Sequence, residues 1–217
     1  AAISATRGPR VLPATSTVTM QKAKNVYTTP VEVTAAPRSK HTGADRQAQW
    51  DLANKLYAQL GEMSFAVERI NGVRTALDDR ASKLPAADAL VKRLRTASND
   101  VDTLRRKIVA TKEGGMITGE ERLRENLTDL YGNVLFYEGR PSQTEVERTD
   151  ALSRELADVV HDFDAWTAKE LPSINAELTK KKLNPITPLT KSAWDAANGG
   201  APGASAPTEL RNVLERD

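Results

Sequence analysis

The sequence predicts a mainly α-helical protein with a small β part, in which a β-hairpin precedes an antiparallel bundle of long helices. Apolar residues recur at spacings of four and three over most of residues 44–180, as in helices that pack along one seam. Residues 15–34 instead alternate apolar and polar side chains with a period of two, which is typical of strands. Proline and glycine separate these stretches.

The composition narrows the class of protein further. The chain has 217 residues, of which 39% are hydrophobic, and its formal net charge is only +2, too small to predict a nucleic-acid or membrane partner. The absence of cysteine excludes disulfides and cysteine-bound metal. No apolar run approaches the roughly 20 residues of a membrane-spanning helix. A start at Ala1 rather than at methionine suggests a processed chain, a trimmed one or a fragment.

Residues 1–40 are expected to form one hairpin. The apolar positions of its two alternating stretches are Val18, Met20, Val31 and Val33. Lys22–Asn25 is the polar turn between them, and a third short strand is expected around residues 10–12. Two or three strands cannot bury a core of their own. The segment must therefore lean on the helices, complete a sheet elsewhere, or belong to a larger β-domain.

The first two helices follow from their seams and breakers. One is expected from about Ala44 to Lys83, closed by a proline, and the next over residues 86–112, closed by Gly114 and Gly115. Arg74 interrupts the first seam where an apolar residue would fit. We expect its stem to lie along the core and its charge to reach a carboxylate on a neighbouring helix.

Capping boxes predict the starts of the next two helices. Thr118 and Glu121 form one box, and the seam that follows ends at Tyr137; Ser142 and Glu145 form the other. Pro172 is expected to kink or break the fourth helix, although its apolar face continues beyond.

The C-terminal part is expected to hold one more short helix, capped by Thr190 and containing Trp194. Residues 198–207 have the composition of a flexible linker, and residues 208–216 can form a weak helix. The expected division is a β-segment at 1–40, a bundle at 41–197, and a linker with a short helix at 198–217.

Two bundles fit these helices. If the chain reverses at Gly114 and Gly115, four helices run up and down in turn. If the glycines merely interrupt, the second and third helices form one rod and three long rods pack together. Two glycines with Gly119 close behind are more than an interruption requires, so the sequence favours the reversal.

No catalytic, metal-binding or cofactor-binding site is expected. The two histidines, His41 and His161, lack the partners of a metal site, and His161 falls off the apolar seam, so we expect it to face solvent. Adjacent acids such as Asp78 and Asp79 have no apolar pocket that would shift their pKa values apart. No phosphate loop or nucleophile motif is present, and no small-molecule ligand is predicted.

Charge is unevenly distributed between the helices. Residues 86–112 are net positive and residues 142–170 are net negative, so the two helices can pair with each other. The basic residues are also the single candidate surface for nucleic acid. Acidic residues interrupt that surface and no aromatic residues interleave, which argues against nucleic-acid binding. The basic residues are Lys92, Arg93, Arg95, Arg105, Arg106 and Lys107.

Contacts with other proteins are expected at apolar and aromatic residues that the packing of the helices does not account for. The open edge of the hairpin can add to a partner's sheet. Aromatic residues can either form a pocket where the first helix begins and the fourth ends, or be the wide end of the core where the β-segment docks. The candidate partner-binding residues are Val18, Met20, Tyr27, Val31, Val33, Trp50 and Trp194.

Several segments over roughly residues 8–195 share a pattern of turns, caps and helix breaks. The segments are Arg10–Thr15, Val18–Met20, Val26–Val33, Ala36–Arg38, Asp45–Trp50, Arg69–Arg74, Tyr137–Ser142, Asp164–Trp166 and Leu171–Asn175. Those before residue 40 resemble the end of a small Ig-like β-domain in secreted bacterial β-propeller proteins of the sortilin-like, BNR-repeat type, often labelled glycosyl hydrolases. Those in the helical part resemble the helical region that follows that domain.

The resemblance implies an extracytoplasmic, non-catalytic module. Where the family favours Gly-Thr-Tyr, this chain has Ala14-Thr15-Ser16, and the propeller that carries the glycosidase label is missing. We therefore expect a periplasmic or secreted structural module, an accessory subunit that docks without membrane insertion onto the periplasmic side of a larger, membrane-bound complex. The alternatives are a C-terminal fragment of a secreted propeller protein and, less favoured, a nucleic-acid-binding bundle.

Overall fold

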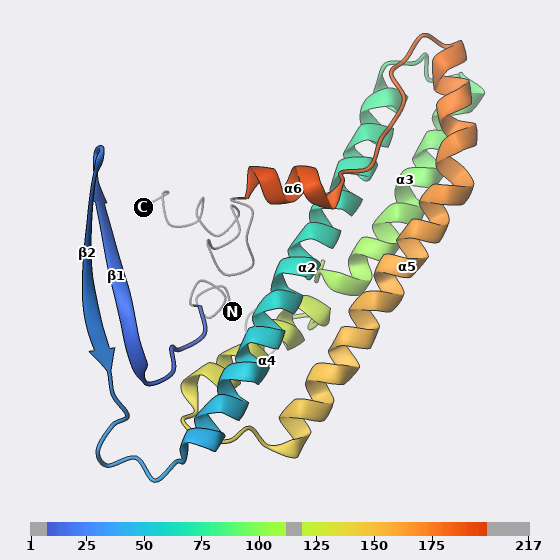
Figure 1. The fold of residues 1–217 in the computed structure, drawn as a ribbon. Helices are drawn as coiled ribbons and strands as arrows, with labels where there is room; N and C mark the ends of the chain where they lie inside the picture. Colours follow the sequence, from blue (N-terminus) through green and yellow to red (C-terminus); the bar gives the residue numbers. More distant parts are fainter. Residues whose placement is uncertain (1–7, 112–118, 199–217) are drawn as a thin grey trace.

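The computed structural model describes residues 8–111 and 119–198 and is mainly helical with one small sheet (Figure 1). This confirms the predicted fold class. Its elements, in chain order, are β1 (Ala14–Lys22), β2 (Asn25–Val33), α2 (Gly43–Ser82), α3 (Ala89–Ile108), α4 (Leu123–Phe136), α5 (Gln143–Lys180) and α6 (Lys191–Ala197).

Three rods make up the bundle, because α3 and α4 follow one another in the same direction along α2 (Figure 1). Near the end of α2, Arg74 pairs with Asp102 of α3 at 3.2 Å. Near its beginning, the Gln49 side chain donates a hydrogen bond to the Val134 carbonyl of α4 at 2.7 Å. Residues later in α3 and α4 thus meet residues progressively earlier in α2.

The favoured reversal between the second and third helices is therefore wrong, and the interrupted rod is correct. The lengths of the seams give the physical reason. Helix α2 has 40 residues and α5 has 38, whereas α3 has 20 and α4 has 14. Only in series can α3 and α4 cover the whole apolar seam of the two long helices, which is the arrangement that buries most apolar surface.

The core follows these seams along the full bundle. Side chains from all four long and medium helices lie in one continuous apolar cluster. Those with 0 or 1% exposure include Leu56, Ile70, Leu77, Leu94, Val101, Leu127, Tyr131, Leu152, Phe163 and Leu178.

Two of the predicted helix starts are correct to within one residue. Thr42 caps α2 in a capping box with Asp45, and Ser142 caps α5 with Glu145. Helix α3 begins later than expected, at Ala89, because the Asp88 side chain accepts the Leu90 backbone N–H at 3.0 Å and fixes the start there.

The start predicted for the third helix is wrong. Helix α4 begins at Leu123, and Thr118 of the expected capping box lies outside the described residues. The carboxylate of Glu120 instead accepts the Thr111 backbone N–H at 2.9 Å, and Glu125 accepts that of Arg122 at 3.0 Å. The first bond ties the segment before α4 to the chain that follows α3, and the second caps the start of α4.

Pro172 does not break α5, which continues through it to Lys180. The residue is exposed, so the carbonyl that loses its hydrogen bond lies on the solvent side of the helix. Residues 10–12 form no third strand among the described residues, and β1 pairs with β2 alone.

Gly139 shapes the connection between α4 and α5. Its φ is +149°, and a Cβ there would lie 2.6 Å from Cε1 of His41. The missing side chain lets the connection close against the segment that leads into α2. This close approach brings the end of α4 next to the segment that joins the hairpin to the bundle.

Candidate protein-interaction surface

The hairpin stands away from the bundle and carries the candidate surface (Figure 1). Each strand has nine residues, and the antiparallel register runs from Ala14 opposite Val33 to Lys22 opposite Asn25. The substantial packing between elements is between helices or between the two strands; neither strand has a comparable interface with a helix.

The register separates the hairpin into an apolar and a polar face, because directly opposite residues point to the same side. Met20 lies opposite Tyr27, and Val18 opposite Thr29. The predicted residues of the hairpin share this face, which holds Ala14, Ser16, Val18, Met20, Tyr27, Thr29, Val31 and Val33. The opposite face holds Thr15, Thr17, Thr19, Gln21, Val26, Thr28, Pro30 and Glu32. We call the first set the apolar face.

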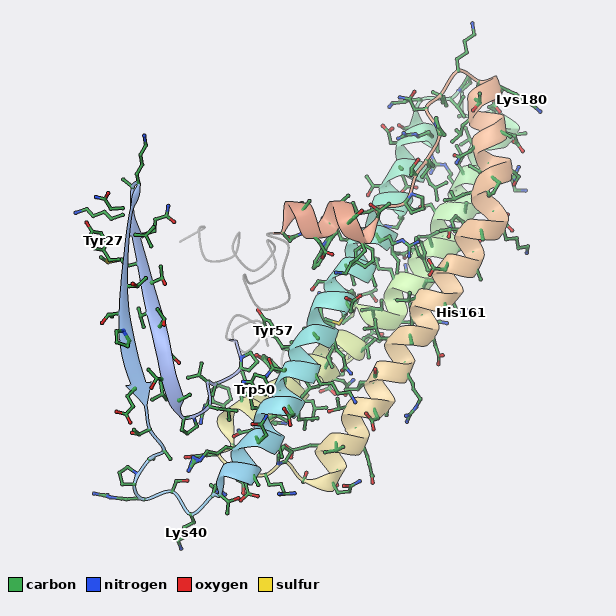
Figure 2. The ribbon with its side chains drawn as sticks, in the orientation of Figure 1. Tyr27, Lys40, Trp50, Tyr57, His161 and Lys180 are labelled. Atoms are coloured by element: carbon green, nitrogen blue, oxygen red, sulfur yellow. The ribbon has the colours of Figure 1, made fainter. Side chains whose placement is uncertain are left out.

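The apolar face is open to solvent. Val18 is 50% exposed, Met20 57% and Tyr27 51%, and of this face Ser16 and Val33 are partly covered. Figure 2 shows Tyr27 near the turn end of the hairpin, far from Trp50 on α2. Adjacent large apolar side chains left in water are the usual mark of a surface that contacts another protein.

Trp50 extends this surface to the base of the hairpin. It is 38% exposed and lines a cavity of about 160 Å³ with residues 10–13, residues 33–36 and the ends of α2 and α4. In the wall of the same cavity Arg46 pairs with Glu138 at 3.1 Å and donates to the His41 carbonyl at 3.2 Å. The ion pair joins the start of α2 to the chain that follows α4, and the base of the hairpin lines the same cavity as Trp50.

Trp194 does not belong to this surface. It is only 9% exposed, its ring lies 5.7 Å from that of Phe65, and its indole N–H donates to Glu68 at 2.6 Å. The indole therefore fastens α6 across the middle of α2. The expected gathering of aromatic residues at one end is likewise wrong, since Tyr57 packs on Tyr131 and the aromatic pairs are spread along α2.

Two exposed aromatic residues were missed at the sequence level. Phe136 is 61% exposed and Tyr137 is 57% exposed, although Tyr137 was expected to end the seam of its helix. The helix ends one residue earlier, and the Tyr137 ring instead meets His41 edge-on at 6.0 Å. Gly139 and Pro141, which disfavour continuation of a helix, follow Tyr137 closely, and they are the sequence signal that could have placed Tyr137 beyond the helix end.

The charged helices do pair with each other. Lys107 of α3 lies 2.9 Å from Asp162 of α5, and Arg93 pairs with Glu177. Arg105 and Arg106 both bind Asp102. Most of the basic residues weighed as a nucleic-acid surface therefore already have carboxylate partners.

The part of the chain that the structure describes contains no group of three or more acidic or histidine side chains placed to hold a metal ion. His161 is exposed, as expected. None of the described helices has the length and apolarity that a membrane crossing requires. The Tyr131 hydroxyl has a pKa raised by burial, but this ring lies in the core and faces no open site.

Replacing Ala23 by glycine should stabilise the hairpin by about 1 kcal/mol. Ala23 has φ of +55° in the two-residue turn, a conformation that costs alanine energy and glycine almost none. Amide hydrogen exchange of the cross-strand residues would measure the gain as slower exchange. Lys24→Gly, at the other turn position, is the control, since Lys24 has no positive φ and should gain nothing.

Comparison of the chain with protein-family models, with curated proteins and with solved structures finds no match.

Proposed function

We propose that this protein is a non-catalytic interaction module outside the cytoplasm, an accessory or scaffold subunit that docks onto a larger, membrane-bound protein complex at its periplasmic face. The observation that supports this proposal is the apolar face of the hairpin, exposed at Val18, Met20, Tyr27 and Val31. The location is inferred from the resemblance to secreted propeller proteins.

The energetics favour an apolar protein surface as the partner. These side chains are 42–57% exposed, so covering the remainder of each one is worth about 1 kcal/mol. Several side chains on one face, backed by Trp50 at the base, can supply the central anchor of an interface. The opposite face carries mainly threonines and has fewer large apolar side chains, Val26 among them, so the partner is expected to contact the apolar face.

The bundle then acts as a stiff support. At 1.5 Å per residue, a helix of 40 residues such as α2 extends about 60 Å. The hairpin projects from the end where α2 begins (Figure 1). An arm on a rigid body of this length suits a subunit that bridges or spaces larger components.

A photo-crosslinking amino acid at Tyr27 tests the proposal in the organism that makes the protein. We expect a discrete adduct with one envelope protein, and Tyr27→Ala should weaken binding to that protein at least about tenfold. The matched control is Thr28, the next residue, whose side chain lies on the opposite face. Equal adducts from both positions, or recovery of the protein in the cytoplasmic fraction, would contradict the proposal.

A second candidate function rests on the same hairpin. Two strands with an uncovered apolar face also resemble the last strands of a larger β-domain, so the chain can be the C-terminal part of a secreted propeller protein. The intact mass of the native protein distinguishes the two, because only this candidate requires a much longer polypeptide.

A further inference from the structure

The two long edges of the hairpin differ in what they offer another strand. Lys22 and Asn25 flank the two-residue turn and form a hydrogen-bonded pair, so bonded and non-bonded pairs alternate from there. Residues of the non-bonded pairs direct their backbone N–H and C=O groups outward. On β1 these are Thr15, Thr17, Thr19 and Gln21, and on β2 they are Val26, Thr28, Pro30 and Glu32.

The outer edge of β2 is blocked. Pro30 lies at one of its outward positions and has no N–H to donate, and Glu32 places a charge at another. Proline and charge on an edge strand are the devices by which sheets prevent the addition of further strands.

The outer edge of β1 carries neither device. All four outward residues have an N–H, and no charged side chain occurs from Ala14 to Gln21. Threonine and valine dominate the strand, and both favour extended backbone. This edge is therefore a ready template for another strand.

We propose that two copies of this chain pair through the outer edges of β1. The strands run antiparallel about a twofold axis at Val18, so that Thr17 of one copy lies opposite Thr19 of the other and Thr15 opposite Gln21. The product is one sheet in the order β2–β1–β1–β2.

The edge is self-complementary in this register, which is why a second copy is the occupant. The register pairs β1 over its whole length and places Lys22 of one copy opposite Ala14 of the other. The two lysines thus lie at opposite ends of the sheet and do not repel. On the apolar face Val18 meets its own symmetry mate, and Met20 meets Ser16.

Pairing also remedies the weakness of the isolated hairpin. Two strands alone are marginally stable in water, whereas a sheet of three or more strands with an apolar face is stable. Twofold dimers are the commonest oligomers. The pairing uses the strand edge and leaves the apolar face free, so it goes beyond the proposed function and does not depend on it.

Disulfide trapping tests the register directly, because the native chain has no cysteine. Residues opposite each other in a non-bonded pair have Cα atoms about 4.5 Å apart, within disulfide range. Val18→Cys should therefore form a covalent dimer of the full chain under mild oxidation. Thr29→Cys is the matched control, on the same face but on β2, where the two copies of the residue lie about 14 Å apart.

Proline variants test the edge. Thr19 and Thr28 are opposite each other in one non-bonded pair, so proline at either position removes one outward N–H and no hydrogen bond of the hairpin. Sedimentation should give a dimer for the native chain and for Thr28→Pro, and a monomer for Thr19→Pro, with helical circular dichroism unchanged.

A native chain that stays monomeric from about 1 µM to 1 mM, the range of weak association, would overturn the proposal. So would a dimer that survives Thr19→Pro, or a Val18→Cys variant that forms no more covalent dimer than Thr29→Cys. If the monomer still gives the Tyr27 adduct with an envelope protein, the pairing is wrong and the proposed function stands.

Discussion

Replacing Phe163 by alanine is expected to destabilise the bundle by about 4 kcal/mol. The ring belongs to α5, is 1% exposed and lies in the core of the bundle, where it contacts Arg69 of α2. Its removal leaves a cavity that the packed helices on either side cannot close. Urea unfolding followed by circular dichroism should show a lower midpoint with an unchanged slope.

Arg69 adds to the cost. Its guanidinium lies 5.1 Å from the centre of the Phe163 ring and pairs with Asp164 at 2.6 Å. Without the ring, the guanidinium loses a contact worth about 0.5–1 kcal/mol. The stack thus ties α2 to α5 beyond the packing alone.

Phe136→Ala is the matched control, because that ring ends a helix at 61% exposure. We expect its effect on stability to stay within about 0.5 kcal/mol. A similar loss from both substitutions would mean that Phe163 is not held in a closed core.

Local rules predicted the helices well and their arrangement less well. The seams of α2 and α5 and the capping residue Ser142 are properties of a few neighbouring residues, and the sequence predicted them directly. Whether α3 and α4 fold back on each other depends on how two short seams match two long ones. That comparison spans the whole chain, and two glycines permit either outcome.

The candidate surface was likewise predictable in part, where local pattern decides, and unpredictable where the packing of distant segments decides. A period of two places Val18, Met20 and Tyr27 on one face whatever the hairpin packs against, so the sequence could predict that face. Trp194 could not be placed, because its burial depends on how the chain after α5 returns to α2. The Asn175 side chain fixes that return by bonding the backbone N–H and C=O of Ile186 at 2.8 and 2.9 Å.

Replacing Asp102 by alanine is expected to cost about 2–3 kcal/mol, less than a fully buried pair because its partners are partly solvated. Asp102 is 9% exposed and binds three arginines. Its oxygens lie 2.7 Å from Arg105, 2.6 Å from Arg106 and 3.2 Å from Arg74. The contact with Arg74 confirms the prediction that this residue, which interrupts the seam of α2, reaches a carboxylate on a neighbouring helix.

Asp100→Ala is the control for this substitution. Asp100 is exposed and lies two residues earlier on the same helix. Its substitution therefore removes the same charge but leaves the contacts between Asp102 and the three arginines in place. We expect its effect to stay within about 0.5 kcal/mol at neutral pH. If Asp100→Ala lowered the free energy of unfolding as much as Asp102→Ala does, both effects would result from the change in net charge.

The pH dependence separates charge from packing at Asp102. Burial raises the pKa of its carboxyl, but hydrogen bonds and charges of Arg105 and Arg106 more than offset this, so the pKa lies below its ordinary value. The native state then binds fewer protons than the unfolded state, and the stabilisation present at neutral pH is lost as the pH falls below about 4. The unfolding free energies of the native protein and Asp102→Ala should therefore converge in acid. A difference that stays constant from neutral pH down to about pH 2 would show that Asp102 acts through its shape and not through its charge.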